Sequence, residues 1–352
     1  MELMHHYANV VSKEALLTRE GISMIWREYI PKEARYPPPG RERDAQVSIQ
    51  TKHSPDILAV KHSFLLHGLL AFSALNLADL NRNSTEVAAR YLAVCDKHQA
   101  VAIAALRDAL DGNVTAENSG ALFALAAVIK ISSMARSCAM ANARPFAHLF
   151  SIDEISEVIL LGRGMREVTT LTYPYVIDTP IALMFKFNAM EDSQANAVSL
   201  PAAVLSHFAD LHAMLDRYHQ QTPAVPSLTE SNKIDDMLSW CHAALTDLES
   251  IYLNIRYWSR HGGLESGHVW RWPATLETRF THLISARYGP ALVLVGHFAA
   301  ATVCLKKAWY VRDWGVYALD GITQALEGDE EMRRWLDWPR EQIRSEMRIV
   351  LD

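Results

Sequence analysis

Histidine is the residue type with the most obvious chemical potential in this chain. Fifteen histidines occur among 352 residues, and several lie in apolar surroundings or beside a tyrosine. His5 and His6 precede Tyr7 near the start of the chain, whereas His67 and His297 interrupt its two most apolar segments. An imidazole ring can donate or accept a hydrogen bond, and near neutral pH it can transfer a proton. We therefore predict catalytic roles for these four histidines and for Tyr7.

Each histidine in an apolar segment has two interpretations. In the plainer one, the ring belongs to the core and bonds to a backbone carbonyl. In the other, the ring projects into an apolar ligand pocket, where it orients the ligand or donates a hydrogen bond to it. A buried polar ring without a partner costs about 1–3 kcal/mol. Both interpretations therefore require a partner, either in the protein or in a ligand.

The segments around His67 and His297 predict the wall of that pocket. Residues 64–78 are apolar on nearly every face, which is typical of a helix in the centre of a bundle, and residues 290–305 are similar. Methionine and aromatic side chains adapt to bulky apolar ligands, although they also fill ordinary cores. The predicted ligand-binding residues are Phe64, Leu66, Leu70, Phe72, Met134, Leu294, Phe298 and Trp309.

Other catalytic chemistries have no signature here. The four cysteines, Cys95, Cys138, Cys241 and Cys304, are separated by 43, 103 and 63 residues, so a zinc finger or ribbon is excluded. Their pattern is typical of reduced, partly buried thiols in an intracellular protein. No GxSxG, P-loop or HExxH motif occurs. Asp235-Asp236 lacks the further acids of a terpene-synthase magnesium motif. We expect neither a cofactor nor a metal.

The elements that must position these residues are helices. No strand-like alternation and no internal repeat stands out, so we predict an all-α fold with one ligand-binding domain over residues 1–352. Residues 31–55 are polar and turn-rich and predict an exposed loop. Gly162-Arg163-Gly164 is expected to end a helix that starts near Ser151, and Gly289-Pro290 to kink a helix over 275–305.

Charge and hydropathy restrict the partners. Lys and Arg number 34 and Asp and Glu 40, which gives a net charge of −6 and argues against direct nucleic-acid binding. Met1–Tyr7 lacks the features of a signal peptide. Residues 64–80 and 290–305 are interrupted and fall short of the roughly 20 residues that span a bilayer. We expect a cytoplasmic protein that binds an apolar small molecule and spans no membrane, and a homodimer is compatible with the sequence.

An ordered set of segments resembles the C-terminal effector domain of fungal zinc-cluster regulators of the sterol-uptake control type. The set comprises Leu3-Met4-His5-His6-Tyr7, residues 64–78, Tyr91 with His98-Gln99, Thr115-Ala116-Glu117-Asn118, residues 160–168, residues 287–292 with His297, Trp314-Gly315 and Trp335-Leu336-Asp337-Trp338-Pro339. The resemblance covers nearly the whole chain. It implies an all-helical domain that encloses a hydrophobic sterol pocket.

The chain also departs from that family. The family's regulators carry an N-terminal finger in which six cysteines bind two zinc ions and contact DNA, and the four cysteines here cannot form one. The resemblance begins within a few residues of Met1. We therefore expect no DNA binding in the family's manner if residues 1–352 are the whole natural product, whereas a longer product could bind DNA through the finger. A nuclear location is expected only if the chain is part of a larger regulator. Asn76 stands where the family commonly has histidine.

Three functional hypotheses follow. The favoured one is a cofactor-free enzyme of fungal secondary metabolism, which promotes cyclisation or cycloaddition of a terpenoid or polyketide by fixing its conformation and donating a hydrogen bond. The alternative is a ligand-sensing effector domain of a zinc-cluster regulator, in which a sterol-like ligand shifts the equilibrium between two packings. The third is a helical scaffold without a small ligand.

Overall fold

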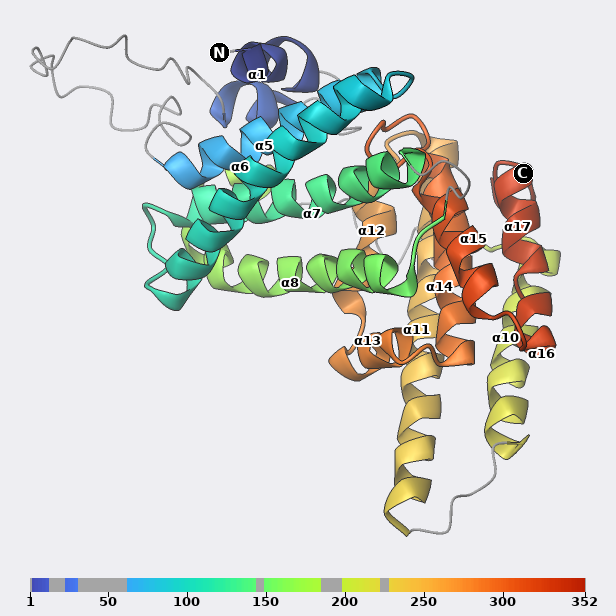
Figure 1. The fold of residues 1–352 in the computed structure, drawn as a ribbon. Coiled ribbons are helices and arrows are strands. Elements are labelled where there is room, and N and C mark those ends of the chain that lie inside the picture. Colours follow the sequence, from blue (N-terminus) through green and yellow to red (C-terminus); the bar gives the residue numbers. More distant parts are fainter. Residues whose placement is uncertain are drawn as a thin grey trace, which may run out of the picture. The chain divides into compact units, whose positions relative to one another are not determined.

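The computed structural model describes residues 2–12, 23–30, 62–143, 149–184, 198–221 and 228–351. Every regular element in these ranges is a helix, and they contain no strand (Figure 1). The all-α prediction is therefore confirmed. The predicted loop over residues 31–55 lies outside the described residues.

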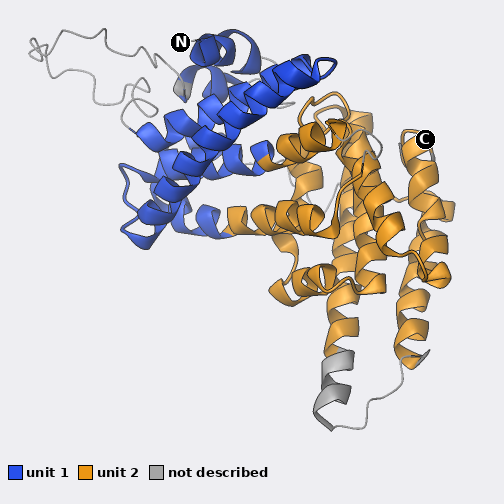
Figure 2. Ribbon diagram, in the orientation of Figure 1, with its two compact units in different colours: residues 1–132, 167–186 blue, residues 133–166, 187–352 orange. Residues whose placement is uncertain are grey.

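The chain divides into two compact units (Figure 2). Unit 1 comprises residues 1–132 and 167–186, and unit 2 comprises residues 133–166 and 187–352. Helices α7 (Ser119–Asn142) and α8 (Ile152–Val176) each contribute residues to both units. Each unit is described by itself below, and the organisation as one domain stays a prediction.

Unit 1 is built on α5, which packs along α6. Helix α5 (Ser63–Leu80) has apolar residues of its own on nearly every face, so it is buried on most sides. Helix α6 (Thr85–Asp111) buries a single stripe, formed by Leu92, Cys95 and Ala102. A Cβ on Gly68 of α5 would lie 2.5 Å from a methyl group of Leu125, so glycine permits the close approach of α7. The elements of unit 1 besides α7 and α8 are α1 (Glu2–His6), η1 (Tyr7–Val11), η2 (Ile25–Tyr29), α5 (Ser63–Leu80), α6 (Thr85–Asp111) and η3 (Pro180–Met184).

Unit 2 is organised around α14 (Gly289–Ala301), in which every residue is buried. Three helices pack against it, namely α11 (Leu228–His261), α15 (Trp314–Ala325) and α17 (Asp337–Arg344). A Cβ on Gly315 of α15 would collide with the carbonyl oxygen of Ala299, so this contact requires glycine. The remaining elements are α10 (Ala202–Gln221), α11 (Leu228–His261), α12 (Ser266–Thr275), α13 (Thr278–Ser285), η4 (Thr302–Leu305), α15 (Trp314–Ala325), α16 (Glu330–Arg334), α17 (Asp337–Arg344) and α18 (Arg348–Leu351).

Helix α8 corrects the prediction that Gly162-Arg163-Gly164 ends a helix, because it continues to Val176. A glycine inside a helix costs only about 1 kcal/mol. At Gly162 the absence of a side chain also permits close packing. A Cβ there would lie 2.7 Å from the Cβ of Pro273, so glycine lets α8 approach α12 within unit 2. Close packing at this position outweighs the local helix-breaking tendency.

The structure around Gly289 also differs from the kinked helix that the sequence predicted. The single kinked helix predicted over 275–305 is two helices, α13 and α14–η4, bent by 100°. Pro290 occupies the first turn of α14, where its missing N–H costs nothing. Helix α12 was not predicted. It begins with a capping box in which Glu265 and His268 each bond to the other's backbone N–H.

Helices α5 and α7 are long and apolar enough to cross a membrane, by length and composition alone. A third span would be counted if the bent pair of helices over residues 278–305 formed a single span. The length argument made from the sequence therefore does not exclude a span. Within the structure, 56% of the α5 window and 72% of the α7 window are buried. The absence of a membrane span stays a prediction.

Candidate functional site

The buried imidazole of His297 is hydrogen-bonded at both ring nitrogens. Its Nδ1 lies 2.8 Å from the carbonyl oxygen of Val293, and its Nε2 lies 2.8 Å from Nε2 of His207 on α10. A carbonyl oxygen only accepts, so Nδ1 of His297 carries the proton and Nε2 is the acceptor. His207 must then donate through its own Nε2. These contacts fix the tautomers of both rings and leave both neutral.

Packing around this pair keeps it neutral. The indole of Trp338 on α17 stacks on His207 and on His297, with ring centroids 4.4 Å and 5.4 Å apart. The hydroxyl of Tyr252 on α11 donates to the carbonyl oxygen of His297 at 2.7 Å. Burial lowers the pKa of His207 to about 4, and burial together with His207 lowers the pKa of His297 to about 3. The pair therefore joins α10, α14 and α17 as an uncharged contact in the core.

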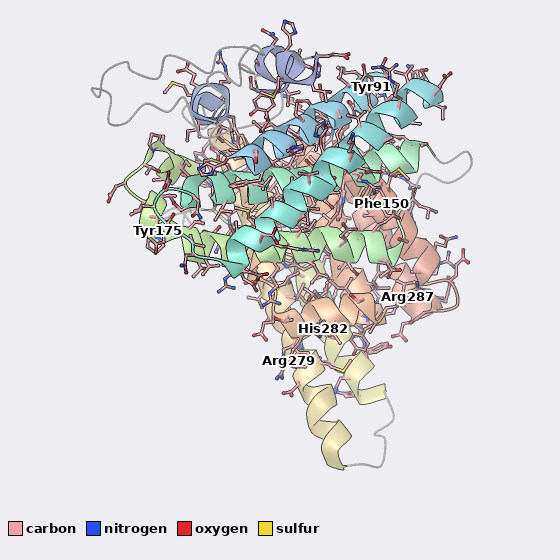
Figure 3. All side chains as sticks on the ribbon, turned by 60° about the vertical axis from the view of Figure 1, so that its left-hand side comes forward. Tyr91, Phe150, Tyr175, Arg279, His282 and Arg287 are labelled. Carbon is pink, nitrogen blue, oxygen red and sulfur yellow. The ribbon has the colours of Figure 1, made fainter. Side chains whose placement is uncertain are left out.

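Beside His297, the ring of Phe298 lies at the centre of an aromatic cluster, defined as Phe150, Trp270, Trp272, Phe298 and Trp314. Trp272 stacks on Phe298 at 4.8 Å between centroids, and Trp270 meets Phe298 edge-on at 5.3 Å. Trp270 and Trp314 are 5.1 Å apart. Phe150, labelled in Figure 3, lies 6.1 Å from Trp314. The cluster joins α12, α14 and α15 to Phe150, which lies two residues before the start of α8.

Two indole N–H groups of this cluster have no hydrogen-bond partner among the described residues. Trp314 is fully buried and Trp270 is 2% exposed, yet neither Nε1 atom has an acceptor. The Nε1 of Trp272, by contrast, donates to the carbonyl oxygen of Ala244 at 2.8 Å. An unsatisfied buried donor costs about 1–3 kcal/mol. The cluster therefore contains two buried donors that no acceptor among the described residues satisfies.

Gln342 on α17 presents a related feature. Its side chain is fully buried, and neither its amide oxygen nor its amide nitrogen has a partner among the described residues. Trp270, Trp314 and Gln342 were not among the predicted ligand-binding residues. The sequence showed that tryptophans gather in the last hundred residues, but it could not show which of them lack an acceptor.

The predicted site residues of unit 2 lie at differing depths. Leu294 and Phe298 are fully buried on α14, four residues apart and therefore on one face. Met134 is 1% exposed, and Trp309 is half-buried. His297 matches the plainer interpretation of a core histidine bonded to a carbonyl. No contact here tests its predicted catalytic role.

In unit 1, Tyr7 and His6 tie the N-terminal turns to the rest of the unit. Tyr7 is buried and donates to the carbonyl oxygen of Trp26 at 3.2 Å, and burial raises the pKa of its hydroxyl. His6 Nε2 lies 2.6 Å from Oδ1 of Asn76, and because an amide oxygen accepts, the imidazole donates. His5 is exposed. Asn76, which departs from the resembled family, is thus the partner of a predicted site residue.

His67 pairs with a histidine that was not predicted. Its Nδ1 lies 2.9 Å from Nδ1 of His98 on α6, and burial together with His67 lowers the pKa of His98. Phe72 is buried. The half-buried predicted ligand-binding residues of unit 1 are Phe64, Leu66 and Leu70.

A third histidine pair lies between α10 and α11 in unit 2. Nδ1 of His212 is 2.7 Å from Nδ1 of His242. Nε2 of His212 is 3.2 Å from a carboxylate oxygen of Glu249, and Nε2 of His242 is 3.0 Å from one of Asp216. Sequence reasoning missed this group. The four-residue step from His212 to Asp216 places both on one face of a helix, but the pairing of α10 with α11 is a tertiary feature.

Comparison with known proteins gives one informative similarity. A Zn(2)-C6 fungal-type transcription factor of Gibberella zeae is 20% identical over 343 residues, which cover 96% of this chain. The chain spans 60% of the length of that relative. No protein-family model and no solved structure matches. The similarity is therefore to a fungal zinc-cluster transcription factor. The sterol-uptake type and a sterol pocket go beyond what it supports.

Proposed function

We propose that this chain is the ligand-sensing effector region of a fungal zinc-cluster transcription regulator, located in the nucleus. The observation that carries the proposal is the similarity to a fungal transcription factor along 96% of the chain. Ligand response, rather than DNA contact, is the role proposed for residues 1–352. Their four cysteines are too few for the six-cysteine zinc cluster, and the net charge of −6 opposes binding to phosphates.

The aromatic cluster supports a class of ligand. Its members are apolar rings, and the indole N–H groups of Trp270 and Trp314 have no acceptor among the described residues. An indole N–H only donates, so the ligand must supply an acceptor such as a hydroxyl or carbonyl oxygen. A bulky apolar molecule with one or two oxygens fits this description. Sterols, terpenoids and polyketides all belong to that class.

The mechanism we propose is a population shift. An acceptor oxygen that bonds Trp270 and Trp314 satisfies two buried donors only in the packing that holds α12, α14 and α15 together around the ligand. A ligand shifts an equilibrium by its difference in affinity for the two states. The favoured state gains RT ln(1 + [L]/Kd), about 2.7 kcal/mol when the ligand is present at 100 times its Kd. The surface of the favoured packing then controls transcription.

A reporter experiment tests the regulatory role. Residues 1–352 are fused to a heterologous DNA-binding domain in a fungal host, and reporter transcription is measured with and without inhibition of sterol synthesis. We expect the fusion to change transcription relative to the DNA-binding domain alone, and the change to respond to the sterol supply. Trp314→Phe should weaken that response because it removes one donor, whereas Trp240→Phe, on α11 outside the cluster, should not.

Transcription equal to that of the DNA-binding domain alone under both conditions would contradict the proposed function. Fusion levels are measured on the same samples by immunoblotting, so that loss of the protein is not mistaken for loss of the response.

A further inference from the structure

We propose that His212 and His242 form a binding site for a divalent transition-metal ion, with Zn²⁺ and Cu²⁺ as the ions to test. The site joins α10 to α11 on the surface of unit 2. It goes beyond the proposed function and does not depend on it, since it shares no residue with the aromatic cluster.

The first argument is the arrangement of the ring nitrogens. The two Nδ1 atoms face each other at 2.7 Å, and the ring planes differ by only 5°. Both Nε2 atoms lie against carboxylate oxygens, which only accept, so both must carry protons. In two neutral rings both Nδ1 atoms would then present lone pairs to each other. A cation between them removes this repulsion, and two imidazole lone pairs are ligands that zinc and copper prefer.

The second argument concerns the partners of the Nε2 atoms. A histidine that ligates a metal almost always donates its other N–H to a carboxylate, carbonyl or water, which fixes the ring and makes the ligating nitrogen more basic. Here Glu249 of α11 supports His212 of α10, and Asp216 of α10 supports His242 of α11. Both supporting carboxylates are therefore in place, and each helix supplies the carboxylate that contacts the histidine of the other helix.

Charge and access favour a dication. With neutral rings, Asp216 and Glu249 give the group a charge of −2, which one divalent ion neutralises. The imidazoles are 32% and 29% exposed, so an ion can enter and water can complete its coordination. At zinc–nitrogen distances of about 2.0–2.1 Å in a tetrahedral site, the two Nδ1 atoms would stand about 3.3 Å apart. The two Nδ1 atoms, now 2.7 Å apart, would have to separate by about 0.6 Å.

The site would have two protein ligands. Among the described residues, no group of three or more His, Cys, Asp or Glu side chains could hold a metal. Water or a ligand from another molecule must fill the remaining positions. We therefore expect modest affinity, with Cu²⁺ bound more tightly than Zn²⁺.

The other two histidine pairs serve as internal controls. In the His207–His297 pair, Nδ1 of His297 is bonded to a carbonyl and its Nε2 accepts from His207, so the pair is already satisfied. The His67–His98 pair also brings two Nδ1 atoms together, at 2.9 Å, but its ring planes are tilted by 44°, and no carboxylate contacts either Nε2 among the described residues. It therefore lacks both the coplanar rings and the supporting carboxylates of the proposed site.

The experiment is a calorimetric titration of the whole, untagged chain with ZnCl₂ and with CuCl₂, with electron paramagnetic resonance of the Cu²⁺ sample. We expect one site per chain, of modest affinity but tighter than any other in the titration, and hyperfine coupling to two nitrogens. His242→Ala should abolish the site. Glu249→Gln, which keeps the size of the side chain, should weaken it about 10- to 100-fold, because it removes the carboxylate behind His212. His98→Ala should leave binding unchanged.

Two results would overturn the inference. One is wild-type binding no stronger than that of His242→Ala, which would mean that a shared proton alone holds the pair. The other is full binding in Glu249→Gln together with loss in His98→Ala, which would place the ion in unit 1. Circular dichroism of each variant shows that it is folded, and Glu249→Gln keeps the test valid if His242→Ala does not fold.

Discussion

Two histidine pairs begin only five residues apart on α10, and they occupy opposite environments. His207 pairs with a fully buried histidine of α14 under a stacked tryptophan, whereas His212 pairs with a half-exposed histidine of α11 between two carboxylates. The N···N distances, 2.8 Å and 2.7 Å, are nearly equal. The contact between the rings therefore does not decide what each pair does.

The difference lies in what holds the remaining nitrogens. A backbone carbonyl on Nδ1 of His297 fixes its tautomer and leaves one acceptor for His207, so that pair is complete and neutral. Carboxylates on both Nε2 atoms of His212 and His242 leave the two Nδ1 atoms facing each other, so that pair is held by a shared proton or, as we propose, by a metal ion. The same side chains thus form a core contact in one place and a candidate ion site in the other.

Among the single substitutions, the largest effect should come from truncating the buried pair. His297→Ala removes the ring beneath Trp338 and leaves His207 without its acceptor, so we expect a loss of about 3–5 kcal/mol in the free energy of unfolding. His212→Ala, at the half-exposed pair, should cost about 1 kcal/mol or less. Urea unfolding of both variants makes the comparison. Equal losses would contradict the distinction between the two pairs.

The same buried pair should also make the stability of the protein depend on pH. The folded-state pKa values of about 4 for His207 and about 3 for His297 lie below the usual 6.5. As pH falls below 6.5, the unfolded chain takes up protons that the folded chain does not. The stability present above pH 6.5 is therefore lost down to about pH 4 and pH 3, by about 1.4 kcal/mol per pH unit for each histidine.

The measurement for this prediction is urea unfolding between pH 7 and pH 4 for the wild type and for His297→Gln. Burial is the main cause of both shifts, and Asp210 opposes the shift of His207. The variant should show the shallower decline, because it lacks one titrating ring. Parallel curves for the two proteins would show that the pair does not titrate in this way.

A smaller effect of opposite sign is expected at Gln342. Unlike His297, this buried residue has no partner at its amide oxygen or nitrogen among the described residues. Gln342→Met keeps the length of the side chain and removes both polar atoms, so we expect the unliganded protein to gain about 1–3 kcal/mol. Urea unfolding measures the gain. A loss of stability would show that the amide is satisfied in solution.

The smallest effect should appear at the pair in unit 1. His67 and His98 are half-buried, and no carboxylate or carbonyl of the described part of the chain contacts their Nε2 atoms. Breaking this pair by His98→Ala removes one hydrogen bond, so about 0.5–1.5 kcal/mol should be lost. A loss as large as that of His297→Ala would mean that burial does not set the strength of these pairs.

The sequence predicted helices better than it predicted contacts. The apolar segment 64–78 lies within α5, which runs from Ser63 to Leu80, and the uniformly apolar residues after Pro290 form the buried helix α14. These features depend on local periodicity and composition. The break expected at Gly162 was wrong because Pro273, more than a hundred residues away, fills the space that glycine leaves.

The candidate sites were less predictable for the same reason. His297 and Phe298 were recognised because they interrupt or extend an apolar run. The partner of His297, the carboxylates beside His212 and the missing acceptors of Trp270 and Trp314 depend on which helices pack together. One sequence contains no direct record of those pairings.

The most direct test of the proposed function identifies what the protein retains. The purified chain and its Trp314→Phe variant are incubated with an organic extract of a source strain that lacks the gene, and free and bound molecules are compared by native mass spectrometry and chromatography. We expect the wild-type chain to retain one apolar, oxygen-bearing compound unchanged and in stoichiometric amount, and the variant to retain about three- to tenfold less, as the loss of one hydrogen bond implies. Protein-dependent conversion of a compound into an isomer, or no retained compound at all, would contradict a ligand-sensing role.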